Sequence, residues 1–338
     1  MQDKTDKIEL SHGSGGRKTQ ELIRTVFQKN YSNIILDQML DAALFEIKGT
    51  KLAFSTDSFV INPIFFPGGD IGKLAVYGTV NDLAVSGAKP YYMSVGMILE
   101  EGFSIDDLRR IADSMALAAN HAKVQIVTGD TKVVEKGSVD KIFINTSAIG
   151  IIPSHIHLHP ANICPGDVII VSGQFGEHGL VIKTRRQEFA FDTPIESDCA
   201  SLLPLTQSLL AYGNKLRCMR DITRGGVATT LNELAEQSSL TFKIEENLLP
   251  VSPVVKGACK MLGMDPLYLA NEGKLVAIVA PDSAEDILHR LHCLEKGKNA
   301  SIIGRVEREL PGMVIIKTSL GGQRILPMLE GDPLPRLC

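Results

Sequence analysis

Short strand-like segments alternate with helical segments along this chain, in two series that a proline- and histidine-rich stretch separates. That stretch runs from Pro153 to Gly166 and ends in a turn signal, CPGD. A length of 338 residues allows two domains of ordinary size, since one domain has about 150 residues. Strands and helices in both halves predict an α/β (α+β) protein with one domain on each side of this boundary.

Apolar periodicity and the positions of glycine and proline define the expected elements. Strands are expected over residues 51–55, 91–100, 124–127, 142–152 and 168–172, and helices over 20–27, 72–88, 105–121, 227–237 and 282–291. Residues 330–338 contain two prolines and a glycine, which favour an extended chain. We therefore expect a first domain over 1–152, a second over 153–327 and a flexible tail over 328–338.

Charge and hydropathy exclude several classes of protein. The 35 Lys and Arg residues against 39 Asp and Glu give a net charge of −4, whereas a nucleic-acid binder needs a basic stripe. No apolar run reaches the roughly 18 residues of a membrane span, and the first 13 residues form no secretion signal. The expected protein is cytoplasmic, with no nucleic-acid or membrane partner.

The six cysteines are scattered and form no C-x-x-C pair, so the sequence predicts neither a zinc site nor a disulfide framework. Five of them are expected to be small hydrophobic side chains. The sixth, Cys338, is the last residue of the sequence and follows two prolines. A thiol on such a tail could reach into a site as a nucleophile, and a chance terminus is the other interpretation.

A glycine-rich sequence, HGSGGRK, covers residues 12–18 and precedes the first expected helix. Three glycines in four residues allow backbone N–H groups to approach a ligand, and a helix N-terminus favours an anion. The sequence matches neither the phosphate-binding G-x-x-x-x-G-K loop nor the dinucleotide G-x-G-x-x-G loop. A flexible N-terminal arm is the alternative.

Four aspartates stand beside small or hydroxyl residues, three of them at positions expected just past strand ends or early in helices and the fourth in a loop that opens a helix. Any one of them is typical of a cap or a turn. Together they suit Mg²⁺, which takes one or two protein carboxylates along with phosphate oxygens. The four are Asp57, Asp82, Asp130 and Asp221. Arg220 and Arg224 flank Asp221 in RDITRGG and suit a phosphate group, unless this is a plain surface loop.

Three histidines, His155, His157 and His159, alternate along the boundary stretch. An extended backbone would point all three to one face, as in a transition-metal site. A solvent-facing linker is the plainer interpretation.

Seven stretches together resemble one family: HGSGG, STDSF, FFPGGDIGKLAVYGTVNDLAVSGAKP, TGDTKVV, RDITRGGV, NEGKL and the final PRLC. They resemble the HypE family of hydrogenase maturation proteins, the carbamoyl dehydratases, over nearly the whole chain. The final Pro-Arg-hydrophobic-Cys is specific to that family. The other motifs are shared with aminoimidazole ribonucleotide synthetases, selenophosphate synthetases and thiamine monophosphate kinases. The resemblance implies the two-domain synthetase fold, with an N-terminal domain that forms a dimeric β-barrel core.

The resemblance also implies a reaction. In this family a carbamoyltransferase, HypF, places a carbamoyl group on the terminal thiol, and ATP then drives dehydration of the thiocarbamate to a thiocyanate. The cyano group passes to the HypC–HypD complex and becomes a cyanide ligand of a nickel–iron hydrogenase. A homodimer that binds ATP and Mg²⁺ is therefore implied.

Positions that match the family's motifs take the implied roles. Cys338 is the expected carrier, and Glu272 and Lys132 are candidates for the base that removes the nitrogen protons. Phosphoryl transfer rests mostly on positioning and charge neutralisation. Nucleotide or phosphate contacts are expected from Gly13, Ser14, Gly15, Gly16, Lys73, Asn81, Thr131 and Arg224, and metal contacts from Asp57, Asp82, Asp130 and Asp221.

Two other functions stay open from sequence alone. The first is a kinase or synthetase of the same superfamily acting on a small free substrate, for which Cys338 is unneeded. Selenophosphate synthetases tend to carry a reactive cysteine near the N-terminus, whereas the first cysteine here is Cys164. The second is a non-catalytic scaffold for metal-cluster assembly that uses the three histidines.

Overall fold

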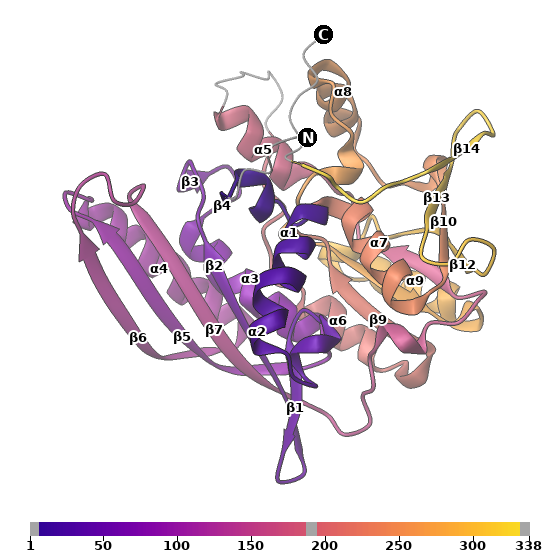
Figure 1. Ribbon diagram of the computed structural model, residues 1–338, viewed down its shortest axis with the longest axis horizontal. Coiled ribbons are helices and arrows are strands. Elements are labelled where there is room, and N and C mark those ends of the chain that lie inside the picture. The colour runs from indigo at the N-terminus through magenta and orange to yellow at the C-terminus, as the bar shows by residue number, and fades with distance from the viewer. Residues whose placement is uncertain (1–6, 187–194, 332–338) are drawn as a thin grey trace.

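The computed structural model describes residues 7–186 and 195–331, so Cys338 and the expected tail beyond Gly331 lie outside the described residues. The described chain is built on a five-stranded sheet in its first half and a seven-stranded sheet in its second half (Figure 1). Helices pack against both sheets. This arrangement confirms the predicted two-domain α/β (α+β) class.

The N-terminal sheet has the strand order β1-β2-β7-β5-β6. Its strands are β1 (Ala43–Ile47), β2 (Thr50–Phe59), β7 (Ile142–Ile152), β5 (Lys89–Glu100) and β6 (Gln125–Val134). β6 runs parallel to β5, and the other neighbours are antiparallel. Lys48 and Gly49 both have positive φ, as a two-residue hairpin between β1 and β2 requires. The sheet is open in the single chain.

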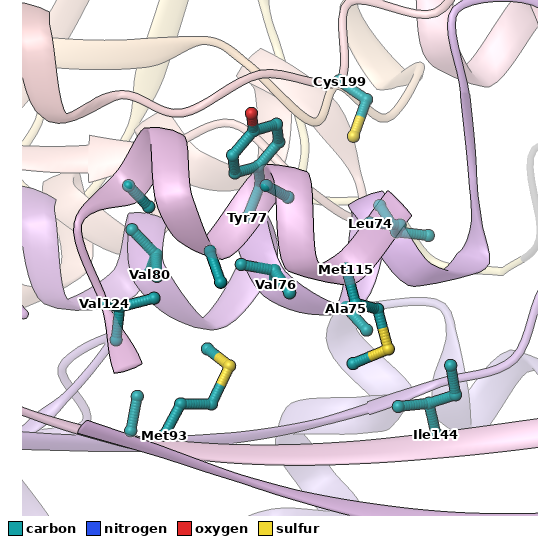
Figure 2. Close-up of a cluster of buried hydrophobic side chains, with 14 of the residues drawn as sticks. Leu74, Ala75, Val76, Tyr77, Val80, Met93, Met115, Val124, Ile144 and Cys199 are labelled. Atoms are coloured by element: carbon teal, nitrogen blue, oxygen red, sulfur yellow. The ribbon is translucent and has the colours of Figure 1, made fainter. Parts of the chain in front are cut away.

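Helix α3 (Ile71–Val85) packs against this sheet beside α4 (Ile105–Ala122). The carboxylate of Asp70 caps α3 by accepting hydrogen bonds from the amides of Gly72 and Lys73. Figure 2 shows the apolar contacts, with α3 side chains above Met93 and Ile144 of the sheet. α3 also contacts α6 and β9 of the second half, and most of its residues are buried. It is the element that joins the two halves.

The C-terminal sheet has the order β14-β13-β10-β12-β8-β11-β9. Its strands are β8 (Val168–Val171), β9 (Leu216–Asp221), β10 (Thr241–Glu245), β11 (Leu275–Val279), β12 (Ser301–Glu307), β13 (Val314–Lys317) and β14 (Gln323–Ile325). Alternate residues of β8 and β11 enter two different apolar clusters. Both faces of the central strands are therefore buried, which explains their unbroken apolar sequence.

Helices cover both faces of this sheet. α7 packs on the side of β10 and β13, whereas α9 packs near β12 together with α6. The helices are α5 (Glu177–Arg186), α6 (Leu203–Leu210), α7 (Gly226–Ser238), α8 (Pro253–Leu262) and α9 (Ala284–His292). A short pair, β3 (Phe65–Phe66) and β4 (Gly69–Asp70), precedes α3.

Most of the expected elements are present, and the bounds of β7 agree with those predicted. Two strands are longer than expected, because pairing with neighbours extends β2 and β6 beyond their apolar stretches. Asp57 and Asp130 consequently lie inside strands, and Asp82 lies near the end of α3. The prediction that these three aspartates follow strand ends or open helices is wrong. Asp221 does end β9.

The N-terminal segment is less regular than the helix expected over residues 20–27. It consists of α1 (Arg17–Leu22), a π-helical turn (Ile23–Gln28) and a short α2 (Lys29–Tyr31). The flexible tail is expected to begin at residue 328, but Met328 and Leu329 are buried. Among the described residues, no helix is both long and apolar enough to cross a membrane.

Candidate functional site

Carboxylates from three elements meet where the two halves of the chain join. Asp57 comes from β2, Asp82 from α3 and Asp221 from the end of β9. Burial raises the pKa of Asp82 well above its ordinary value, and the charges of Asp57 and Asp221 raise it further. Burial, with the charge of Asp41, likewise raises the pKa of Asp221. The group therefore favours either protons or a bound cation.

Neighbouring hydroxyls hold this group in place. Ser55 Oγ donates to Asp82 Oδ2 at 2.5 Å, and Thr79 Oγ1 donates to Asp57 Oδ2 at 3.1 Å. Hard carboxylate oxygens are the donors that Mg²⁺ prefers, and it takes one or two of them from a protein, so this group has the chemistry that the predicted ion needs. No group of three or more His, Cys, Asp or Glu side chains within residues 7–186 and 195–331 forms a ready-made metal centre. The remaining ligands of an ion here would have to come from phosphate and water.

Arg220 lies beside this group and is itself paired with two carboxylates. Its Nε contacts Asp41 Oδ1 at 2.8 Å, and its Nη2 donates to Glu233 Oε2 at 2.8 Å. Burial raises the pKa of Asp41 to about 6 against the opposing charge of Arg220. The guanidinium thus offsets part of the negative charge of the group.

Asp130 is not part of this group. It is exposed on β6 and faces Lys132, whose Nζ lies 3.8 Å from Asp130 Oδ2. Thr131 lies between them on the same exposed strand. The sequence placed Asp130 with the other aspartates, but its strand is at the far edge of the N-terminal sheet. In the single chain, Asp130 is therefore separate from the other three aspartates predicted to contact a metal.

Glu272 lies close to the carboxylate group, in the loop before β11. Its side chain is only 15% exposed. Burial raises its pKa well above the ordinary value, and the charges of Asp198, Asp221 and Asp57 add to this. The amide of Glu272 donates to Asp198 Oδ1 at 3.0 Å, which fixes the loop. A carboxyl group of raised pKa in a buried junction is suited to proton transfer.

His178 stands next to Glu272 and was not singled out from the sequence. Its Nδ1 lies 2.8 Å from Ser197 Oγ, and its Nε2 lies 4.0 Å from Glu272 Oε1. Burial lowers the pKa of His178 to about 4, so the imidazole is neutral at pH 7. No spacing in the sequence relates residue 178 to residue 272, because only the fold of the second half brings α5 to this loop.

Several predicted phosphate contacts have partners inside the chain. The side-chain amide of Asn81 donates to the carbonyl of Ala200 at 3.0 Å and accepts from the amide of Leu202 at 2.8 Å. Lys73 Nζ donates to the carbonyl of Gly68 at 2.7 Å. Asn81 thereby links the two halves, and Lys73 stays near the junction at the start of α3.

The glycine-rich loop packs against two other parts of the chain. Arg224 Nη1 donates to the carbonyl of Gly13 at 3.1 Å, which brings the loop to the RDITRGG sequence. The amide of Gly15 donates to Thr19 Oγ1, and the amide of Arg17 donates to the carbonyl of Leu329. These two amides are used within the chain. Ser14 Oγ also bonds internally, to the carbonyl of Ser11.

The three histidines do not form a metal site within the described chain. His157 Nδ1 lies 3.2 Å from Lys51 Nζ, and His159 Nδ1 accepts from the amide of Ala161. His155 is exposed. The plainer interpretation, a linker, accounts for these contacts.

The five internal cysteines divide into two groups. Cys199, Cys218 and Cys259 are buried, as expected of small hydrophobic side chains, whereas Cys164 and Cys293 are exposed, contrary to that expectation. Burial raises the pKa of all three buried thiols, that of Cys218 to about 12 and that of Cys259 to about 11. These three are poor nucleophiles.

Comparison with known proteins first defines a class. Residues 39–152 match the N-terminal domain of AIR synthase related proteins, and residues 164–316 match the C-terminal domain. The fold is also similar to that of thiamine monophosphate kinase from Aquifex aeolicus, with a TM-score of 0.65, 19% identity, and coverage of 91% of this chain and 99% of that one. The chain is thus a two-domain AIR synthase related protein.

Closer relatives then give the family. Carbamoyl dehydratase HypE of Rhizobium leguminosarum bv. viciae is 47% identical over 98% of this chain and 95% of its own length. HypE of Escherichia coli K12 is 46% identical over 98% and 100%. A crystal structure of HypE in complex with ATP has a TM-score of 0.81 at 46% identity, covering 97% and 98%. This chain belongs to the carbamoyl dehydratase HypE family of hydrogenase maturation proteins.

Proposed function

We propose that this protein uses ATP to dehydrate an S-carbamoyl group on Cys338 to an S-cyano group, which supplies the cyanide ligands of a nickel–iron hydrogenase. The observation that carries the proposal is the position of Glu272, a buried carboxyl of raised pKa, beside the aspartate group. One part of this junction suits a metal–phosphate unit and the other suits proton transfer. The family's solved ATP complex supports the choice of nucleotide.

The chemistry requires a better leaving group than hydroxide. Transfer of the γ-phosphoryl group to the carbamoyl oxygen breaks the bond to ADP and forms a carbon–oxygen–phosphorus link. Loss of both nitrogen protons then gives the C≡N bond, and the carbamoyl oxygen leaves in inorganic phosphate. Mg²⁺, when bound, would neutralise phosphate charge. Asp57, Asp82 and Asp221 would hold it, and Lys73 and Arg224 would bind phosphate oxygens.

Glu272 is the proposed base for the nitrogen protons, and the neutral imidazole of His178 lies beside it, with Nε2 4.0 Å from Glu272 Oε1. The Glu272→Gln variant is expected to accept the carbamoyl group normally and to dehydrate it about 100-fold or more slowly, since a general base contributes that much. The raised pKa means that the base form grows as pH increases. Single-turnover dehydration should therefore rise with pH in the native protein, and that rise should be absent from Glu272→Gln. An unchanged profile would exclude Glu272.

A homodimer is proposed because the edge strand β6 presents apolar side chains to solvent. Ile126, Val127 and Val133 are 42%, 56% and 67% exposed. An exposed apolar edge strand in a single chain invites pairing with another chain. Asp130 and Lys132 share this strand, so we propose that dimer formation brings them, with Thr131, to the nucleotide.

The Val133→Glu variant tests this interface. The variant should shift the protein from dimer to monomer, because the new charge would be buried at the contact. The fold of the single chain should stay intact, because the side chain of Val133 is exposed there. Light scattering after size exclusion measures the mass. The matched control is Leu320→Glu, at a position 97% exposed in the second half. Equal masses for both variants would contradict the proposed surface.

The proposed partners are the carbamoyltransferase HypF and the HypC–HypD complex, in the cytoplasm. A solved HypE–HypF complex, at 47% identity and a TM-score of 0.87, covers 91% of this chain and 99% of that chain, which supports the first partner.

One mass-spectrometry experiment tests the whole reaction. Incubation with the carbamoyltransferase, its carbamoyl donor and ATP should add about 43 Da, and dehydration should then remove about 18 Da. Carbamoyl groups labelled with ¹⁸O should deliver the label to inorganic phosphate. ATP turnover on a free small molecule without either adduct would favour a superfamily kinase. Normal hydrogenase maturation without ATP turnover would favour a scaffold.

A further inference from the structure

The last described residues form a fixed root for the tail. Leu326, Met328 and Leu329 are buried. Asn232 Nδ2 donates to the carbonyl of Leu326 at 3.0 Å, and Tyr268 Oη donates to the carbonyl of Pro327 at 2.9 Å. In Figure 1 this segment returns from β14 across the top of the second half toward α1. We call residues 326–330 the tail root.

The glycine-rich loop packs against the tail root. The amide of Arg17 donates to the carbonyl of Leu329 at 2.8 Å, and Arg17 Nη1 lies 3.7 Å from Glu330 Oε1. A Cβ at Gly16 would overlap the carbonyl oxygen of Leu329 and lie 2.8 Å from its carbon. Gly16 therefore has no room for a side chain while the root stays in place.

The glycine-rich loop also packs against the RDITRGG sequence. Gly15 has φ +82°, and a Cβ there would lie 2.7 Å from Arg224 Cβ. Arg224 also donates to the carbonyl of Gly13. The loop thus lies between the root of the tail and the sequence that carries Asp221. Packing against Leu329 and Arg224 therefore accounts for Gly16 and Gly15 of the motif independently of any phosphate.

We propose that Gly16 is a positioning residue, which anchors the tail root so that Cys338 reaches the junction of the two halves. The inference rests on the proposed function. Seven residues follow Gly331 up to Cys338, and they span at most about 25 Å. Tethering from a near anchor gives the carried group a high effective concentration, which falls when the anchor moves. Dehydration within the chain needs the anchor, whereas carbamoylation by a separate protein does not.

The Gly16→Ala variant separates the two steps. We expect complete carbamoylation and, at saturating ATP, single-turnover dehydration slowed about tenfold or more. Gly257→Ala is the control, because Gly257 is exposed in α8 and a Cβ there meets nothing within 4 Å. It should behave as the native protein does. Native-rate dehydration by Gly16→Ala would overturn the inference, as would a loss confined to ATP binding, which would indicate a phosphate role.

A second variant and a peptide keep the test clear if Gly16→Ala folds poorly. Tyr268→Phe removes only the hydrogen bond to Pro327 and should slow dehydration by about two- to fivefold. A carbamoylated peptide of residues 332–338, supplied in excess, should be dehydrated equally by Cys338→Ala and by Gly16→Ala/Cys338→Ala, since a free peptide needs no anchor. Unequal rates would indicate site damage. Absence of any dehydration by the native protein would instead refute the proposed function.

Discussion

Replacing Asp82 by asparagine is expected to lower ATP turnover about 100-fold or more while making the protein more stable. The amide side chain would keep the acceptor for Ser55 Oγ and nearly the same volume, but it would remove one proposed Mg²⁺ ligand charge. The native carboxylate is buried among like charges, which raises its pKa. A folded-state pKa above the unfolded value means that ionisation destabilises the native fold.

Because ionisation of Asp82 destabilises the fold, the effect of this residue on stability depends on pH. The stability cost of Asp82 is absent near its unfolded pKa and grows as pH rises toward the folded value, above which it is constant. Thermal unfolding of metal-free protein should therefore show a gain for Asp82→Asn at pH 8, of about 2–4 °C per kcal/mol, and little gain near pH 4. Mg²⁺ should stabilise the native protein more than the variant.

Asp167→Asn is a control for which the opposite change in stability is expected. Asp167 is also buried, but its carboxylate accepts from Arg217 Nε at 3.1 Å and from the amide of Cys164 at 2.7 Å. Neutralising it leaves a partly buried guanidinium without its counter-charge, so stability should fall. If both variants lose stability, Asp82 is held by favourable contacts, and the proposed charge repulsion is wrong.

The Cys338→Ala variant is expected to show neither the carbamoyl nor the cyano adduct while ATP still binds. The thiol is the proposed covalent carrier, so its loss removes the substrate and leaves the nucleotide site at the junction unchanged. Intact mass measures the adducts, and calorimetry measures nucleotide affinity. Adducts on Cys338→Ala protein would refute the terminal-thiol mechanism.

The exposed cysteines are the matched controls. Cys164 and Cys293 are the thiols within the described residues that solvent reaches. Cys164→Ala and Cys293→Ala should each retain both adducts at the native level. The three buried thiols need no such control for accessibility, since burial raises their pKa and keeps them protonated. Loss of the adducts from either control would move the carrier away from the tail.

Local patterns in the sequence determined the two-part α/β architecture and most of its elements. Apolar and β-branched residues define β7 over Ile142–Ile152, and the helix expected over 72–88 is α3, Ile71–Val85. These signals depend on neighbours a few residues away, so they can be read without the fold. The motifs shared with the family likewise pointed to Glu272 and to Asp57, Asp82 and Asp221.

The tertiary structure alone decided which of these residues meet. Asp130 shares its sequence context with Asp57, yet β6 lies at the sheet edge, and Asp130 is exposed. His178 and Glu272 are far apart in the sequence, and their contact depends on how α5 packs beside the loop before β11. The glycine-rich loop carried a phosphate signal locally, but its packing on Leu329 became visible only when the two ends of the chain came together. Contacts of this kind arise from packing between distant segments, and no local propensity encodes them.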